Sequence, residues 1–310
     1  MNVSMMRPAL ASMCTSFVFA GCAAGGNAGP QAPLCIEAGA PASATLLQVF
    51  RGTLAGGAHS SLIAPEQLAV SANDMWIADR GRGELVRVDR TMQRSVVMAR
   101  ASGRVAGLHV DRLRSVYLAL PAQRVVRQLG FDGRLEREYR NIEGRMIPVD
   151  VVTDGTGPVF VADGANARVV IFNRLGQVTG TLGELVSRPS PFLSVNALAQ
   201  EAGRLYVLDA SARKVHVVRE DGAMETLDLA GTVNLPVALA VDRWHRIFIG
   251  DSGGRVVMFE ADAVRAPSSI EGLPRIAQLG DLWIDETGVL YLADTAGGAV
   301  YSLQVTAPCP

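Results

Sequence analysis

Four oxygen-bearing side chains stand at related positions in this chain and could act on one ligand together. Each precedes, by one or two residues, a short apolar segment that the sequence predicts to be a β-strand. They are Glu66, Asp150, Asn196 and Asp281. Carboxylate and amide oxygens are the hard ligands that Ca²⁺ prefers. If the strands surround one axis, these oxygens would converge at the mouth of a central channel. They would form either a Ca²⁺ site or a hydrated rim, and we expect them not to complete a metal site.

The histidines of this chain do not suggest a metal centre. They are His59, His109, His216 and His245, and they occupy different parts of the repeat described below. Only His109 is expected to approach the axis. The sequence also lacks a Cys–His cluster, a Gly-X-Ser-X-Gly motif, a phosphate-binding loop and a dinucleotide fingerprint. We therefore assign no catalytic residue.

The elements that would position these side chains belong to an internal repeat. An aromatic residue, a β-branched residue or Leu, a small or apolar residue and usually Asp recur at intervals of 41 to 46 residues. The tetrapeptides are 76–79, 117–120, 160–163, 206–209, 248–251 and 291–294. A period near 40–50 residues made of short strands is typical of a β-propeller. The sequence therefore predicts an all-β, six-bladed propeller.

Each repeat contains an apolar strand that ends before Asp, then the aromatic strand, a Val-rich strand and a more variable fourth strand. Four antiparallel strands make one blade, which buries its two apolar faces only against its neighbours. This explains the continuous apolar runs and the 49% hydrophobic content. We expect the aspartates that end the second strands to accept hydrogen bonds from turn N–H groups. We also expect the basic residues before the third strands to pair with them: Arg124, Arg168, Lys214 and Arg255.

The ends of the repeat array indicate how the ring closes. The sixth repeat ends with its third strand near Val305, and residues 45–51 form a predicted strand with no repeat of their own. Pairing the two would complete the last blade and remove an open sheet edge. We therefore assign residues 45–305 to one propeller domain and residues 306–310 to a C-terminal tail.

The first 21 residues are typical of a secretory signal, with Arg7 as the only charge before an apolar stretch. The sequence Phe19-Ala20-Gly21-Cys22 resembles the lipobox of bacterial lipoproteins, which implies cleavage before Cys22 and lipid attachment to it. The alternative is an ordinary signal cleaved after Ala20. Ala23 follows the cysteine, a pattern that in Gram-negative lipoproteins implies the outer membrane. Residues 22–44 are rich in Gly and Pro and predict a flexible tether.

Two cysteines remain for a disulfide. Cys14 leaves with the signal and Cys22 takes the lipid, whereas Cys35 and Cys309 lie on either side of the ring. Antiparallel pairing of the closing strands would bring both tails to the same end of the last blade. An exported, oxidising compartment then favours a Cys35–Cys309 disulfide over two free thiols.

The charges of the chain are nearly balanced. It has 29 Lys and Arg residues against 30 Asp and Glu residues, a formal net charge of −1. Nothing in this balance marks a surface for nucleic acid or for an anionic membrane. Contact with a membrane is therefore expected only through the lipid anchor.

The repeat pattern resembles the NHL repeat of six-bladed propellers. The agreement is best from Pro148 through Asp163 to Phe172 and Gly176. This resemblance implies the fold and not the function, because such propellers include enzymes and binding proteins. Lactonases of the gluconolactonase type hold a divalent metal with a Glu, Asn and Asp set similar to the four residues above, but this sequence lacks the rest of that pattern. Amidating lyases bind zinc through channel histidines, which fall in different registers here.

We favour binding over catalysis. The expected function is that of an exported, membrane-anchored lipoprotein, at the outer membrane facing the periplasm or at the cell surface. It would present its rim loops as a rigid platform to a protein or glycan partner, with no cofactor. The alternative is a metal-dependent hydrolase or lactonase with Ca²⁺ at the channel mouth. A third possibility is an accessory subunit of an envelope redox or secretion assembly.

Overall fold

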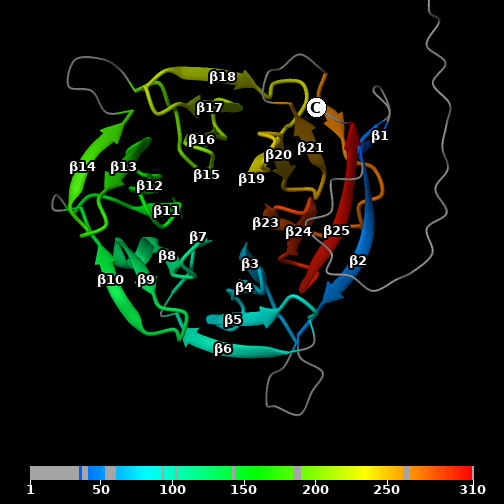
Figure 1. Ribbon diagram of the computed structural model, residues 1–310, viewed down its shortest axis with the longest axis horizontal. Helices are drawn as coiled ribbons and strands as arrows, with labels where there is room; N and C mark the ends of the chain where they lie inside the picture. The colour runs from blue at the N-terminus through cyan, green and yellow to red at the C-terminus, as the bar shows by residue number, and fades with distance from the viewer. Residues whose placement is uncertain are drawn as a thin grey trace, which may run out of the picture. The chain divides into compact units, whose positions relative to one another are not determined.

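The computed structural model describes residues 35–36, 41–52, 61–92, 94–101, 103–141, 144–183, 190–260 and 266–308. These residues form six sheets around a central axis (Figure 1). The predicted all-β, six-bladed propeller is therefore confirmed. Within the described residues, no helix is long and apolar enough to cross a membrane.

The blades follow one another along the chain, each built from antiparallel strands. Blade one consists of β3 (Pro65–Val70), β4 (Asp74–Asp79), β5 (Glu84–Asp89) and β6 (Ser95–Arg100). Blade two consists of β7 (Gly107–Val110), β8 (Val116–Leu120), β9 (Val125–Leu129) and β10 (Leu135–Tyr139). Blade three consists of β11 (Pro148–Val152), β12 (Val159–Asp163), β13 (Arg168–Phe172) and β14 (Val178–Leu182). The next two consist of β15 (Ala197–Glu201), β16 (Arg204–Asp209), β17 (Lys214–Val218) and β18 (Met224–Asp228); and β19 (Pro236–Val241), β20 (Ile247–Asp251), β21 (Val256–Phe259) and β22 (Ser268–Ser269). The sixth consists of β23 (Leu279–Ile284), β24 (Val289–Asp294), β25 (Ala299–Pro308) and β2 (Ser43–Phe50).

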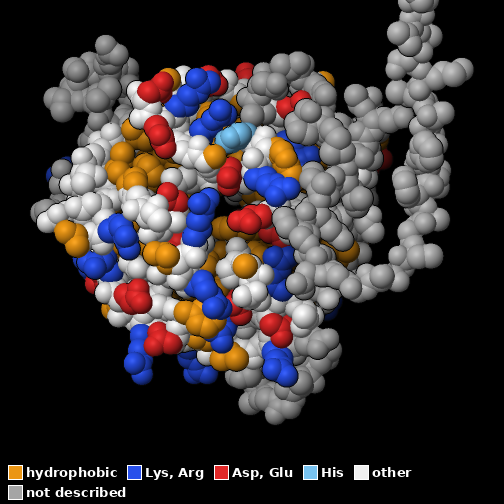
Figure 2. Space-filling view, viewed as in Figure 1, with side chains coloured by type: hydrophobic (Ala, Val, Ile, Leu, Met, Phe, Trp, Pro, Cys, Tyr) orange, Lys and Arg blue, Asp and Glu red, His pale blue; other side chains and the backbone are white. Residues whose placement is uncertain are grey.

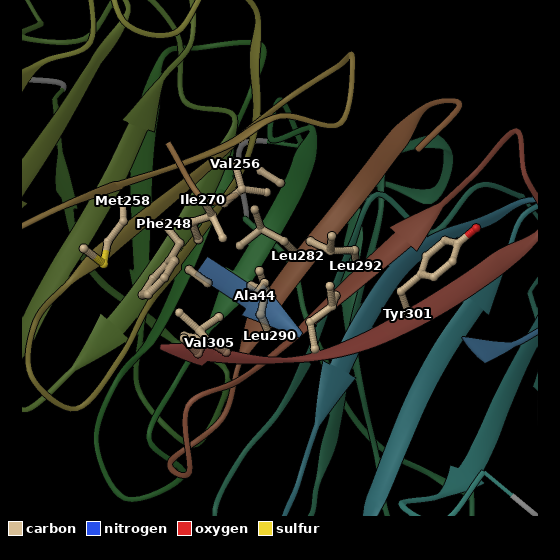
Figure 3. Packing of buried hydrophobic residues seen from close by; sticks show 14 of the residues in the cluster. Ala44, Phe248, Val256, Met258, Ile270, Leu282, Leu290, Leu292, Tyr301 and Val305 are labelled. Carbon is tan, nitrogen blue, oxygen red and sulfur yellow. The ribbon is translucent and has the colours of Figure 1, made fainter. Parts of the chain in front are cut away.

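The core lies between neighbouring blades, as the continuous apolar strands require. Trp76 and Leu85 of the first blade pack in one cluster with Leu118 and Val125 of the second. Figure 3 shows the corresponding cluster between the fifth and sixth blades, where Phe248 faces side chains from β23, β24 and β25. Full burial of such a side chain stabilises the fold by about 1.5–3 kcal/mol.

The predicted ring closure is confirmed. Strand β2 pairs antiparallel with β25, from Ser43 opposite Thr306 to Phe50 opposite Val300. Ala44 of β2 is buried in the cluster between the last two blades. The N-terminal strand therefore covers the edge of β25 and contributes to the core.

A short strand that the sequence did not predict, β1 (Cys35–Ile36), pairs in parallel with Ala307 and Pro308 at the end of β25. Cys309 lies outside the described residues, so the Cys35–Cys309 disulfide stays a prediction. The predicted signal segment, Cys22 and most of the predicted tether also lie outside them.

The aspartates at the ends of the second strands fix the connections between blades. Asp79 accepts hydrogen bonds from the N–H groups of Ile63 and Ala64 in the incoming connection, each at 2.9 Å, and from Gly81 in the following turn. Asp209 and Asp294 repeat this arrangement. The structural role predicted for these aspartates is confirmed.

The predicted basic partners of these aspartates are only partly correct. Arg168 Nε donates to Asp163 at 3.0 Å. Arg124 instead donates to the Gly144 carbonyl, and Arg255 Nε donates to Ser269 Oγ. Blade two has Leu120 in place of the aspartate, and in blade five Asp251 already accepts the backbone N–H groups of Gly253 and Arg255. These two arginines therefore bind other acceptors.

Candidate functional site

A cavity of about 1060 Å³ lies among the first strands of the six blades. We call one end of the cavity the loop face. It consists of the connections between blades, such as 103–106 and 190–196, and of the turns between second and third strands, such as 80–83 and 210–213. At the other end is the turn face, which carries the turns between first and second strands, such as 71–73. Figure 2 shows acidic and basic side chains interspersed around the centre of the ring.

The predicted residues Glu66, Asp150, Asn196 and Asp281 all line this cavity. Glu66, Asp150 and Asp281 lie on the inner strands β3, β11 and β23, and Asn196 directly precedes the inner strand β15. Asn196 Oδ1 accepts hydrogen bonds from Ser194 Oγ at 2.6 Å and from the Ala210 N–H at 3.0 Å. The side chain of Asn196 therefore stabilises its own connection.

Asp150 and Asp281 occupy the same register in blades three and six. One oxygen of each carboxyl group accepts the N–H of the next residue, and the other accepts an N–H from the inner strand of the following blade. The second bond is 2.7 Å from Leu198 to Asp150 and 3.0 Å from Leu68 to Asp281. These two carboxyl groups therefore join neighbouring blades at the channel wall.

The channel wall also changes the acidity of the two groups. Burial raises the pKa of Asp150 to about 7, although its two backbone N–H donors favour the ionised form. Burial raises the pKa of Asp281 well above its usual range, and the negative charge of Asp150 raises it further. Asp150 can therefore exchange a proton near neutral pH.

Gly107 allows Asp150 to take this position. A Cβ atom on Gly107 would lie 2.5 Å from Asp150 Cα and 2.6 Å from Asp150 Oδ1. The absence of a side chain at Gly107 lets the inner strands of blades two and three approach closely.

Glu66 is held by two arginines that the sequence did not identify. Its Oε1 lies 2.9 Å from Arg104 Nη2 and 3.5 Å from Arg80 Nη1. Its side chain is almost entirely buried, and Oε2 has no hydrogen-bond partner. No repeated pattern marks these two arginines. Arg80 directly follows the second strand β4, where no other repeat has a basic residue, and Arg104 lies in a connection between blades.

An aromatic pair covers one side of the channel. Trp283 of blade six and His109 of blade two share a register and lie with their ring centroids 5.7 Å apart, above the small Ala69 of blade one. His109 Nε2 lies 2.7 Å from the Thr153 carbonyl oxygen, which can only accept, so Nε2 carries the proton and Nδ1 is a bare acceptor. Burial lowers the pKa of His109 and keeps its ring neutral.

The expectation that His109 approaches the axis is confirmed, since this residue lines the cavity. Among the described residues, no group of three or more His, Cys, Asp or Glu side chains is arranged to hold a metal ion. His59 lies outside the described residues.

The outer surface of the loop face combines arginines with exposed apolar side chains. Its exposed arginines include Arg80, Arg104, Arg124, Arg145, Arg213 and Arg275. Ile63, Leu193 and Leu235 are 54%, 72% and 66% exposed. The aspartates that accept the N–H groups of Ile63 and Leu193 fix the backbone from which these side chains project.

The fold and the axial cavity define this chain as a six-bladed β-propeller. Its structure is similar to that of a gluconolactonase from Xanthomonas campestris, with a TM-score of 0.63, 15% identity and coverage of 89% of this chain and 98% of that one. It is also similar to virginiamycin B lyase from Staphylococcus aureus, with a TM-score of 0.62, 10% identity and coverage of 84% and 99%. No protein-family model matches the sequence, and no curated protein matches it. At these identities the similarities establish the fold alone.

Proposed function

We propose that this protein is an exported lipoprotein of the cell envelope and that its loop face is a rigid platform for a protein or glycan partner. The observation that carries the proposal is the combination of arginines and exposed Ile63, Leu193 and Leu235 on one face. The three side chains project from three separate connections, so the face offers a partner several apolar contacts together with arginines. Arginine is favoured at interfaces because its planar guanidinium binds carboxylates through two hydrogen bonds.

The connections of this face are held in place before any partner binds. Asp209 accepts the N–H groups of Leu193 and Ser194 and the Ser194 hydroxyl at 2.7–3.1 Å. Each hydrogen bond to a charged group contributes about 1.5–3 kcal/mol. A preorganised surface loses little conformational entropy on binding, which favours affinity.

The platform can be tested with two matched double variants. Leu193→Asp with Leu235→Asp changes the loop face. Leu135→Asp with Leu175→Asp changes leucines of similar exposure, 55% and 69%, on an outer strand and on a turn between outer strands. A partner that co-purifies from solubilised membranes should be lost only with the loop-face variant. Loss with both variants, or with neither, would contradict the proposal.

The lipid anchor has its own test. Cys22→Ser should move the protein from the membrane fraction to the soluble fraction, because the lipid supplies the membrane affinity. Mass spectrometry should detect a lipidated N-terminal Cys22 in the unchanged chain. An unmodified N-terminus, or cleavage after Ala20, would exclude lipid attachment.

A second candidate is a metal-dependent hydrolase or lactonase acting in the channel. Its support is the fold similarity to a gluconolactonase and the raised pKa of Asp150, since perturbed carboxyl groups in a cavity are typical of active sites. Elemental analysis of protein purified without added metal, followed by assays of lactone hydrolysis, tests this candidate. A stoichiometric metal together with hydrolysis would favour it over the platform.

A further inference from the structure

We propose that the axial channel binds an organic ammonium ion, a ligand with a protonated amine attached to an apolar or aromatic group. This site lies inside the ring and does not rest on the function proposed for the loop face. The first argument is the set of unsatisfied polar atoms in the cavity wall: Glu66 Oε2, His109 Nδ1 and Gln200 Oε1. All three are hydrogen-bond acceptors, so the missing partner is a donor.

Glu66 gives the most direct indication of a ligand. The residue is 7% exposed, and a buried carboxylate oxygen without a donor is costly to the fold. The two other buried polar atoms without a partner in the described chain, Trp76 Nε1 and His216 Nε2, belong to residues that do not line the cavity. The unpartnered acceptors in the wall thus mark the channel as the place where a donor binds.

The charges of the channel favour a cation. Asp150 and Asp281 line the channel from opposite blades, three and six. Each carboxylate keeps lone pairs beyond its two backbone N–H bonds. The arginines of the lining lie at its two ends: Arg80 and Arg104 at the loop face, and Arg90, Arg112, Arg114 and Arg243 at the turn face.

Acidic groups of the lining accompany the arginines at both ends. Arg80 and Arg104 contact Glu66, and Arg90 binds Asp285 at 2.5 Å. The remaining acidic groups at the turn-face end are Asp111, Asp154, Glu201, Asp242 and Glu286. The middle of the channel therefore presents carboxyl groups without an adjacent basic side chain.

The apolar part of the ligand has a counterpart in the wall. Trp283 lines the cavity, whereas the same register holds the small Ala199 and Ala240 in blades four and five. Trp283 on one side and the small side chains of Ala199 and Ala240 on the other leave room for a ring or chain next to the indole. A cation close to a Trp ring gains additional electrostatic attraction.

A neutral polyol or an anion fits these features less well. A polyol supplies donors but leaves the repulsion between Asp150 and Asp281 unchanged, and an anion adds to that repulsion. An ammonium ion supplies donors and neutralises charge. Because a nearby cation favours ionised carboxylates, binding should release protons near neutral pH.

The test is isothermal titration calorimetry of the full chain in detergent with three matched probes. They are 2-phenylethylammonium, neutral 2-phenylethanol and anionic 3-phenylpropionate. We expect saturable binding of the ammonium probe, at least about tenfold weaker binding of the other two, and proton release measured in buffers of different ionisation enthalpy. Trp fluorescence should change on binding, as Trp283 lines the site.

Variants distinguish this site from nonspecific binding. Asp150→Asn with Asp281→Asn should weaken the ammonium probe by about tenfold or more and abolish the proton release. Asp132→Asn, at an exposed turn carboxylate, should change neither. Circular dichroism confirms that each variant is folded. Absence of saturable binding at millimolar probe, equal binding of the neutral probe, or full affinity in the folded double variant would overturn the proposal.

Discussion

The two channel carboxyl groups should make the stability of this protein fall as the pH rises from about 4 to about 7. Between the ordinary Asp pKa of 3.8 and the folded value of about 7, Asp150 is protonated in the folded chain and ionised in the unfolded chain. The folded state therefore binds the extra proton, and the free energy of unfolding decreases with pH at about 1.4 kcal/mol per unit. The full difference is at most about 4 kcal/mol. Since Asp150 is partly exposed in the channel, we expect about half of it.

The assay is urea unfolding of the unchanged chain and of Asp150→Asn at several pH values from 4 to 8. Asn has one carbonyl oxygen for the two N–H groups of Val151 and Leu198, so the variant loses one hydrogen bond at every pH. This loss shifts the whole curve by about 1–3 kcal/mol and does not change its slope. The difference in slope between the two proteins measures the titration of Asp150 together with its effect on the titration of Asp281.

Asp281 needs a parallel measurement because the two groups interact. Because the negative charge of Asp150 raises the pKa of Asp281, we expect Asp150→Asn to lower the folded pKa of Asp281. Comparing Asp281→Asn with the unchanged chain measures the contribution of Asp281 to the slope. Parallel curves for the unchanged chain and Asp150→Asn would refute the reasoning. They would mean that solvent in the channel hydrates the carboxylate and that burial does not raise its pKa.

Two further predictions concern covalent and steric constraints. Cys35 and Cys309 should both be unreactive toward a thiol reagent in the unfolded, unreduced protein, and two reactive thiols would exclude the disulfide. Reduction of the disulfide should lower the free energy of unfolding by at most about 5 kcal/mol. Gly107→Ala should destabilise the fold by about 1–3 kcal/mol in thermal unfolding, because its Cβ would lie 2.5 Å from Asp150 Cα. Gly253→Ala is the control and should leave the stability nearly unchanged, because the nearest atom to its Cβ would lie at 3.4 Å. Equal melting temperatures for the two Ala variants would show that blades two and three can move apart at this position without loss of stability.

The sequence was sufficient for the architecture because the fold repeats a local pattern. Each aromatic tetrapeptide became a second strand, and the unpaired segment before the first repeat became β2, two residues longer at its start than expected. Strand β1 was not predicted because two residues carry too little pattern. The predicted ion pair of Arg255 with an aspartate was wrong. The backbone N–H of Arg255 donates to the Asp251 carboxylate, and the guanidinium group donates to Ser269.

The candidate site was predictable only in part. The sequence correctly predicted that four residues line one cavity, because their positions within the repeat place them near the start of an inner strand. They are Glu66, Asp150, Asn196 and Asp281. The ion pair of Glu66 with Arg104 depends on the path of a connection between blades, which the repeat does not determine. The contact between Trp283 and His109 crosses a whole blade and depends on the small side chain of Ala69 between them.

The residues of the channel site are the exceptions to the repeat, and this distinguishes them from residues that build the ring. At the register of Asp150 and Asp281, blades four and five carry Ala197 and Ala238 and still form complete sheets. The fold therefore does not require a carboxyl group there, and the raised pKa means that these groups lower stability at neutral pH. Repeated aspartates such as Asp79 behave in the opposite way, since each satisfies several backbone N–H groups that would otherwise be unpaired. A side chain that the architecture can replace by Ala, and that destabilises it when ionised, is best explained by what enters the channel.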